Sequence, residues 1–331
     1  MTLIEEAGDS GIAAERLAAV AGSAAIEGRS LGRIAWNRLK RDKVAMAGGI
    51  LVVLLILMAI FAPWLASLEG QDPTSLNNNL IDPNYATPIG GLGGISGSHW
   101  LGVDVPGGRD IFARIVYGAR YSLGIAGVAT LVAIVFGVVL GMIAGYFGGI
   151  VDAVLSRLMD LFLAFPVLLL SISILGVLPN SAFGLSGNGL RIALLIVVIG
   201  FFSWPYIGRI VRGQTLAMRE REFVDAARSL GASPFRIIFK EILPNLVAPI
   251  LVFATLLIPV NILFEAALSF LGVGMREPTP SWGAMINSAI QTFQIDPEFL
   301  IVPGAAIFLT VLAFNLFGDG LRDALDPKAS R

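Results

Sequence analysis

The sequence predicts an all-α integral membrane protein with six transmembrane helices and both termini in the cytoplasm. Of its 331 residues, 56% are hydrophobic and only 14% are charged, whereas soluble domains usually carry about 25% charged residues. Uncharged stretches about as long as a bilayer-spanning helix occur six times. They cover residues 44–68, 121–151, 161–190, 192–208, 242–264 and 299–318.

The third and fourth of these stretches need adjustment. Residues 161–190 exceed the length of one span and end in the turn-rich PNSAFGLSGNG, so we expect the third helix near 154–178. Residues 192–208 form the shortest stretch, and Arg191 and Arg209 at its ends can extend their charged groups to the interfaces.

Lysine and arginine indicate the orientation, because they are enriched in cytoplasmic segments. With six spans and cytoplasmic termini, 18 of the 23 lysines and arginines lie inside, and the opposite topology reverses this bias. The sequence therefore predicts a multi-pass membrane protein in this orientation. The five basic residues on the outside are Arg109, Arg114, Arg120, Arg191 and Arg276.

The chain divides into a cytoplasmic lead, an external segment and a core. Helical spacing in the lead is carried by Leu17, Val20, Ala21 and Ala24. The predicted regions are a lead at 1–43, a first transmembrane helix at 44–66, an external segment at 67–118 and a core at 119–331, with a second external segment at 271–298 and a charged cytoplasmic loop at about 213–245.

This charged loop predicts a helical hairpin between spans four and five. Gly231 suits a left-handed helix cap, Ser233 offers an oxygen as N-cap, and Pro234 suits a first helical position. Such a hairpin either docks a partner or lies on the bilayer surface. One predicted apolar face comprises Phe223, Ala226, Ala227 and Leu230, and a stripe continues through Ile238, Ile242 and Leu246.

The hairpin sequence EFVDAARSLGAS (222–233), followed by ILPN (242–245), resembles the signature loop of ATP-binding-cassette importer permeases. Asp225 stands where that pattern usually has glutamate. Further blocks resemble the second permease of the dipeptide, oligopeptide and nickel import systems, with one extra residue in VDVPGGRD. These blocks are HWLGVDVPGGRDIFARIVYGARYSL (99–123), GMIAGYFGGIVDAVLSRLMD (141–160), EAALSFLGVG (265–274), PTPSWGAM (278–285) and LTVLAFNLFGDGLRDALDP (309–327).

The resemblance implies a permease of the bacterial inner membrane that carries peptides delivered by an external binding protein. It also implies a homologous permease as partner and two ATPase subunits that hold ATP and magnesium. Nickel chelates or other small solutes are alternative cargo. The residues that this resemblance assigns to ATPase coupling are Glu222, Asp225, Ala226, Ala227, Gly231, Ser233, Leu243 and Pro244.

Two patterns inside the spans each allow two interpretations. Gly137, Gly141 and Gly145 place small residues on one helix face, which suits packing within this chain or against the homologous permease. Asn261, Glu265 and Ser269 share one face of span five. Because ionisable residues inside spans are commonly functional, one interpretation is that these residues line the translocation pathway. The alternative is that they form a structural hydrogen-bonded group.

Several classes of site are excluded by the composition. The chain has no cysteine and a single histidine, and it contains no Gly-Lys dipeptide and therefore no P-loop. We expect no catalytic residues, no metal site and no cofactor in this chain, and a bonded loop around His99, Asp104, Arg109 and Asp110. The net charge of −1 argues against nucleic acid as a partner.

Two other functions fit an apolar six-span chain. A proton-coupled secondary transporter uses an intramembrane acid such as Glu265 as a relay, and a channel or receptor uses the hairpin as a signalling dock. Loss of uptake with a protonophore distinguishes the first, and absence of a bound ATPase distinguishes the second.

Overall fold

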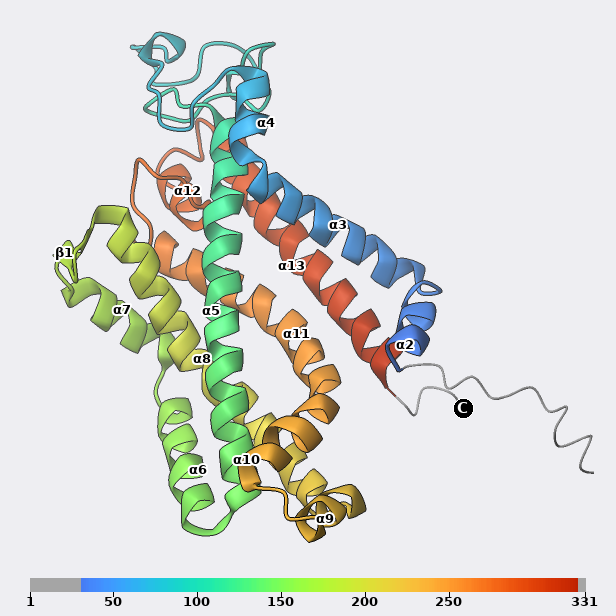
Figure 1. Cartoon of the computed structure of the whole chain (residues 1–331). Coiled ribbons are helices and arrows are strands. Elements are labelled where there is room, and N and C mark those ends of the chain that lie inside the picture. Colours follow the sequence, from blue (N-terminus) through green and yellow to red (C-terminus); the bar gives the residue numbers. More distant parts are fainter. Residues whose placement is uncertain (1–30, 327–331) are drawn as a thin grey trace, which may run out of the picture.

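The computed structural model describes residues 31–326 as a bundle of long helices (Figure 1). Among these residues, five stretches are long and apolar enough to cross a membrane, and a bent pair of helices supplies a sixth if it counts as one span. The single helices are α3 (Lys43–Ile60), α5 (Ile111–Phe147), α8 (Gly187–Arg219), α11 (Leu243–Phe270) and α13 (Pro297–Leu325), and the pair is α6 (Gly149–Ala164) with α7 (Val167–Val177).

The two ends of the bundle differ, and we call them the hairpin end and the cap end. Figure 1 shows the short helix α2 near the hairpin end and α4 at the cap end. The predicted helical spacing of Leu17, Val20, Ala21 and Ala24 lies outside the described residues. The hairpin end carries α2 (Leu31–Leu39), α9 (Glu222–Ser229), α10 (Pro234–Arg236) and the π-helical turn η3 (Ile237–Ile242), and the cap end carries α4 (Ala62–Glu69), η1 (Asn78–Leu80), η2 (Leu92–Gly94) and α12 (Trp282–Ala289).

The expectation of one third helix near 154–178 is wrong. The helix breaks between α6 and α7, which are bent by 79° relative to each other. Pro166 lacks an N–H group, and its ring disfavours helical geometry at the preceding residue. Phe165 accordingly has extended backbone angles (φ −79°, ψ 139°). A proline inside the apolar run LFLAFPVLLL therefore decides the shape of this span.

Several helix boundaries also differ from those predicted from uncharged windows. The first span ends at Ile60 rather than near 66, and α4 follows it with a proline in its first turn. Helix α5 begins at Ile111, inside the predicted external segment 67–118, and α8 continues to Arg219, inside the predicted loop 213–245. Charged residues terminated the predicted windows, but the helices continue through them. Arg114 of α5, for example, pairs with Glu277, and Arg212 of α8 pairs with Asp152.

The fold also contains one small departure from the all-α prediction. Strands β1 (Ser181–Ala182) and β2 (Leu185–Ser186) form an antiparallel pair between α7 and α8. The two residues between them, Phe183 and Gly184, both have positive φ angles, 54° and 76°. Such angles are those of the tight turn that best matches the twist of two short strands.

Helix α5 runs through the centre of the bundle and packs closely on α8. Gly137, Gly141 and Gly145 lie on the contacting face. A Cβ atom on Gly141 would lie 2.6 Å from the carbonyl oxygen of Gly208, and one on Gly145 would lie 2.7 Å from that of Arg212. These glycines therefore pack within the chain, where they allow two backbones to approach.

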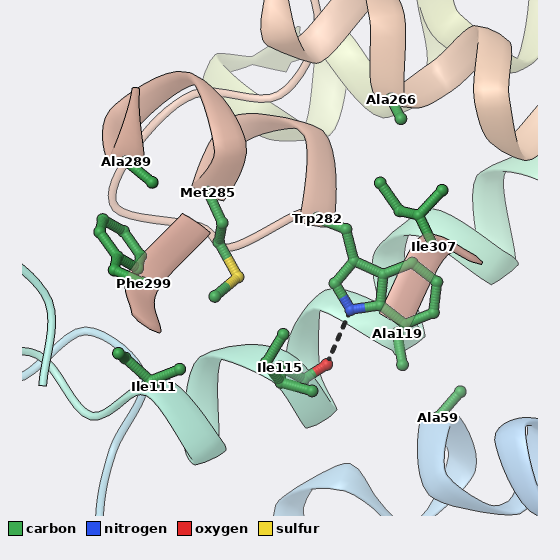
Figure 2. Close-up of a cluster of buried hydrophobic side chains, with 10 residues drawn as sticks. All are labelled: Ala59, Ile111, Ile115, Ala119, Ala266, Trp282, Met285, Ala289, Phe299 and Ile307. Carbon is green, nitrogen blue, oxygen red and sulfur yellow. Dashed lines mark hydrogen bonds between the residues drawn. The ribbon is translucent and has the colours of Figure 1, made fainter. Parts of the chain in front are cut away.

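A second packed centre lies at the cap end, around the Trp282 indole (Figure 2). Trp282 is fully buried, and its Nε1 donates a hydrogen bond to the carbonyl oxygen of Ile115 at 3.1 Å. In Figure 2, Ile111, Met285 and Phe299 lie to the left of the hydrogen bond between Trp282 and Ile115. The indole thus joins α12 to the first turns of α5.

We predict that Gly141→Ala destabilises the protein by about 1–3 kcal/mol, because the new methyl group must push α5 away from α8. The matched control is Gly127→Ala on the same helix, where no atom lies within 4 Å of the new Cβ. Removing that glycine should stabilise the helix by about 0.5–1 kcal/mol. Thermal unfolding of the two purified variants measures the difference, and equal midpoints would contradict the packing role.

Candidate functional site

The hairpin consists of α9, a tight break and the continuous stretch from α10 into α11. Gly231 has φ +78°, and N–H groups of Gly231 and Ala232 donate to the carbonyls of Arg228 (2.9 Å) and Ala227 (3.0 Å). This pair of bonds is the Schellman arrangement that ends a helix. Ser233 then accepts a hydrogen bond from the Arg236 N–H at 3.4 Å, so the predicted cap residues are confirmed.

The base of the hairpin is buried against the ends of α5 and α8. Ile238, Ile242 and Leu246 form the predicted apolar stripe, and each is at most 1% exposed. Val224, which the sequence did not single out, is fully buried in the same cluster. One buried side chain in an eight-residue helix gives no periodicity, so no sequence pattern could have revealed this anchor.

The predicted apolar face of α9 points outward. Phe223 is 39% exposed and Leu230 is 88% exposed, while Ala226 is exposed and Ala227 is partly buried. Phe235, after the break, is 66% exposed. The tip of the hairpin therefore presents large apolar side chains that no part of the described chain covers.

Charged groups border this apolar surface. Glu222 and Asp225 are exposed, and Asp225 forms an ion pair with Arg228 at 3.2 Å. The Arg228 guanidinium also lies 5.6 Å from the centre of the Tyr146 ring, at the end of α5. This contact ties the charged side of α9 to the bundle.

The hairpin continues without a break into the fifth span. The helical stretch from Pro234 to Phe270 is continuous, with six residues in π-helical geometry. Leu243 is partly buried and Pro244 is exposed, both in the first turn of α11. A displacement of the hairpin would therefore move the end of α11 directly.

Ion pairs that the sequence did not indicate join α6 to α8 at the hairpin end. The Arg212 guanidinium donates to both carboxylate oxygens of Asp152, with Nη2 to Oδ2 at 2.7 Å. Arg209 pairs with Asp160 at 2.6 Å. These partners are far apart in the chain, so only the fold brings them together.

The three candidate pathway residues on α11 are all buried within the chain. Ser269 Oγ donates to Glu265 Oε1 at 2.7 Å, and the two residues are 1% and 0% exposed. Asn261 accepts from Ser203 at 3.1 Å and donates to Thr130 at 2.8 Å. The bond between Glu265 and Ser269 fits the interpretation that they form a structural hydrogen-bonded group. That these residues line the translocation pathway stays a prediction.

Asn261 also borders a cavity of about 460 Å³ between α7, α8 and α11. Its wall is mostly apolar, with aromatic rings from Phe202, Tyr206 and Phe253. Ser203 and Asn261 supply polar groups, but these are bonded to each other. The cavity is therefore suited to uncharged groups.

The predicted external loop forms a bonded cap around the start of α5. His99 Nδ1 and Asp110 Oδ2 lie 2.8 Å apart, and Asp110 also caps α5 by accepting from the Ala113 N–H at 2.7 Å. Arg109 pairs with the buried Asp104 at 2.8 Å. Across residues 31–326, no group of three or more histidine, cysteine or acidic side chains could hold a metal ion.

A further acidic residue closes this cap. Glu277, on the segment between α11 and α12, accepts from Arg114 at 2.6 Å and from Arg109 at 2.5 Å. Arg114 is fully buried at the start of α5. The network thus ties the segment before α5 to the segment after α11, and sequence reasoning placed only Arg109 and Asp104 in it.

The chain belongs to the family of binding-protein-dependent transport system inner membrane components, whose model matches residues 137–331. Residues 30–88 match the N-terminal transmembrane domain of oligopeptide transport permease C. The chain is therefore the permease subunit of an ATP-binding-cassette importer and not an enzyme, since the ATPase of such importers is a separate subunit.

Curated relatives agree with this assignment. The glutathione transport system permease protein GsiD of Escherichia coli O6:K15:H31 is 44% identical over 296 residues, 88% of this chain and 89% of that protein. GsiD of Shigella flexneri serotype 5b is 45% identical over the same shares. A solved structure of the methionine ABC transporter MetNI, inward-facing, shares the fold, with TM-score 0.51, 19% identity, and coverage of 64% of this chain and 96% of its own.

The cap leads to a prediction about pH, through Glu69 at the end of α4. This carboxyl group accepts a hydrogen bond from the Trp100 N–H and lies beside the Asp110 carboxylate. Burial, together with the Asp110 charge, raises the pKa of Glu69 to about 7 from 4.5. The folded protein therefore holds a proton that the unfolded chain loses near pH 4.5, so stability falls as pH rises towards 7.

We expect Glu69→Gln to reduce this decline, because glutamine resembles the protonated carboxyl at every pH. Thermal unfolding midpoints at pH 5, 6, 7 and 8 measure the decline in stability, which should occur between about pH 4.5 and pH 7. Part of the decline should remain, since burial raises the pKa of Asp296 to about 6. The control Glu220→Gln, at the hairpin end, should keep the full decline. An unchanged slope in Glu69→Gln would contradict the assignment.

Proposed function

We propose that this chain forms one half of the translocation pathway of a bacterial peptide importer, with a homologous permease as the other half. In this proposal two ATPase subunits bind ATP and magnesium, and an external binding protein delivers the substrate. The curated relatives carry the name of a glutathione transport permease, which supports a small peptide as cargo.

The hairpin is proposed as the docking site for an ATPase subunit. The observation that supports it best is the exposed apolar tip formed by Phe223, Leu230 and Phe235, which stands on a buried base. Apolar patches with a charged border are typical of protein interfaces. Glu222 and Asp225 supply that border.

The same geometry supports a mechanical role for the hairpin. Val224 and Ile238 anchor it to α5 and α8, and η3 carries it into α11. A displacement imposed on the tip by ATP binding or hydrolysis would therefore reach three spans together. Coupling of this kind requires that the partner binds the two conformations of the permease with different affinities.

We also propose the orientation, with the hairpin end in the cytoplasm and the cap end outside. The lysine and arginine bias of 18 to 5 supports it. In this orientation the ATPase subunits meet the hairpin, and the cap faces the binding protein.

The docking proposal predicts that Gly231→Arg abolishes ATPase binding. The position has open space within the chain, with no atom within 4 Å of a new Cβ, so the arginine would project from the tip into the partner. We expect copurified ATPase and substrate uptake to fall at least about tenfold, which corresponds to about 1.4 kcal/mol of lost binding. Copurification in mild detergent and uptake in cells measure the two quantities.

Two controls separate shape from backbone strain. Gly149→Arg places the same side chain at another glycine of the hairpin end that has positive φ (+52°) and open space, at the first residue of α6. Gly231→Ala imposes the strain of a positive φ angle without the bulk. Both should retain most of the ATPase. Full ATPase binding and uptake in Gly231→Arg would refute the proposal.

The orientation can be tested by labelling, because the natural chain has no cysteine. In intact spheroplasts, a membrane-impermeant maleimide should label Phe183→Cys, whose parent side chain is 94% exposed in the β1–β2 turn. It should reach Ser229→Cys on the hairpin only after the membrane is permeabilised. The reverse pattern would place the hairpin outside and contradict the orientation.

A further inference from the structure

The short helix α2 is fixed in place at the hairpin end. Ala35 and Leu39 are buried, 8% and 5% exposed, in a cluster with Ala45 of α3 and Ala324 of α13. Arg38 Nη1 also donates to the Asp326 carbonyl oxygen at 2.9 Å. Figure 1 shows α2 beside the end of α13, directly before α3. These contacts hold one face of α2 against the bundle and turn the other face outward.

The outward face combines an aromatic ring with positive charges. Trp36 and Lys40 are four residues apart and therefore neighbours on the helix surface. Trp36 is 50% exposed, and Lys40 Nζ lies 5.0 Å from the centre of its ring. Arg41 and Lys43 follow and are exposed as well. The ammonium group over the ring is a cation–π contact, which orients both side chains.

This group stands at the start of the first span. Lys43 is the first residue of α3, whose remaining residues carry no charge. Tryptophan and basic residues are enriched at the level of lipid headgroups, where an amphipathic ring and a cation are both well solvated. The fixed position of α2 therefore presents these groups at the boundary between the apolar span and water.

Three basic side chains, Lys40, Arg41 and Lys43, outnumber Asp42, the one acidic side chain among them. Asp42 accepts hydrogen bonds from the N–H groups of Val44 and Ala45 at 2.9 and 3.0 Å, so its carboxylate caps α3. Asp319 and Asp323 are exposed on α13, which packs on the buried side of α2.

We propose that Trp36, Lys40, Arg41 and Lys43 form a binding site for the headgroup of an anionic phospholipid in the leaflet at the hairpin end. The phosphate accepts hydrogen bonds from the lysine and arginine groups, and the indole contacts the glycerol and upper acyl region. Orientation of the chain requires positive charge only, whereas this surface adds an exposed tryptophan, a cation–π contact and a docked helix. The basic side chains thus select a negatively charged headgroup, and Trp36 places the site at the level of the lipid headgroups.

Native mass spectrometry of the full chain in neutral detergent tests the proposal, with phosphatidylglycerol or phosphatidylcholine added. We expect tighter binding of phosphatidylglycerol. Lys40→Gln/Arg41→Gln should weaken it by more than tenfold, because each basic residue near an anionic surface contributes about fivefold. Phosphatidylcholine binding should not change. Trp36→Ala should weaken binding of both lipids.

The matched control is Arg157→Gln/Lys240→Gln, which removes the same charge from exposed positions of the same end. It should retain the wild-type preference for phosphatidylglycerol. A melting temperature equal to that of the wild type, measured without lipid, shows that a variant is folded. If the double variant is not folded, the single variants Lys40→Gln and Arg41→Gln are tested in its place. Equal binding of the two lipids, equal loss in the control, or displacement of the lipid by inorganic phosphate would each overturn the proposal.

Discussion

The close contact between α5 and α8 is the constraint on which the rest of the structure depends. It requires glycine at Gly141 and Gly145, because backbone carbonyls occupy the space that a Cβ would need. At the hairpin end, the same two helices supply the apolar floor that receives Val224 and Ile238. At the cap end, α5 receives the Trp282 indole. One helix pair thus positions both functional ends of the molecule.

Polar ties supplement this packing at the ends of the spans. In lipid, helices gain little from hydrophobic association, so close packing and hydrogen bonds must hold them together. The Asp152–Arg212 pair fastens the first turn of α6 to α8. Glu277 fastens the segment after α11 to Arg114 on α5. Both ties are at least partly buried, so they are less screened than surface ion pairs.

The hairpin end presents two outward surfaces with different chemistry. The tip of α9 exposes Phe223 and Leu230 beside acidic groups, whereas α2 exposes Trp36 beside basic groups. An apolar surface in water favours a protein partner, and a basic surface at the edge of a span favours anionic lipid. Each surface stands on a buried base, so the bundle fixes its orientation before any partner binds.

The sequence by itself determined the membrane class, the six apolar stretches and the chemistry of the hairpin break. Gly231 and Ser233 act through neighbours within five residues, so their local pattern was sufficient. Only the tertiary structure decided the anchor at Val224 and the partner of Arg212, which lies 60 residues away. These features depend on contacts between segments that are distant in the chain, and local patterns carry no record of such contacts.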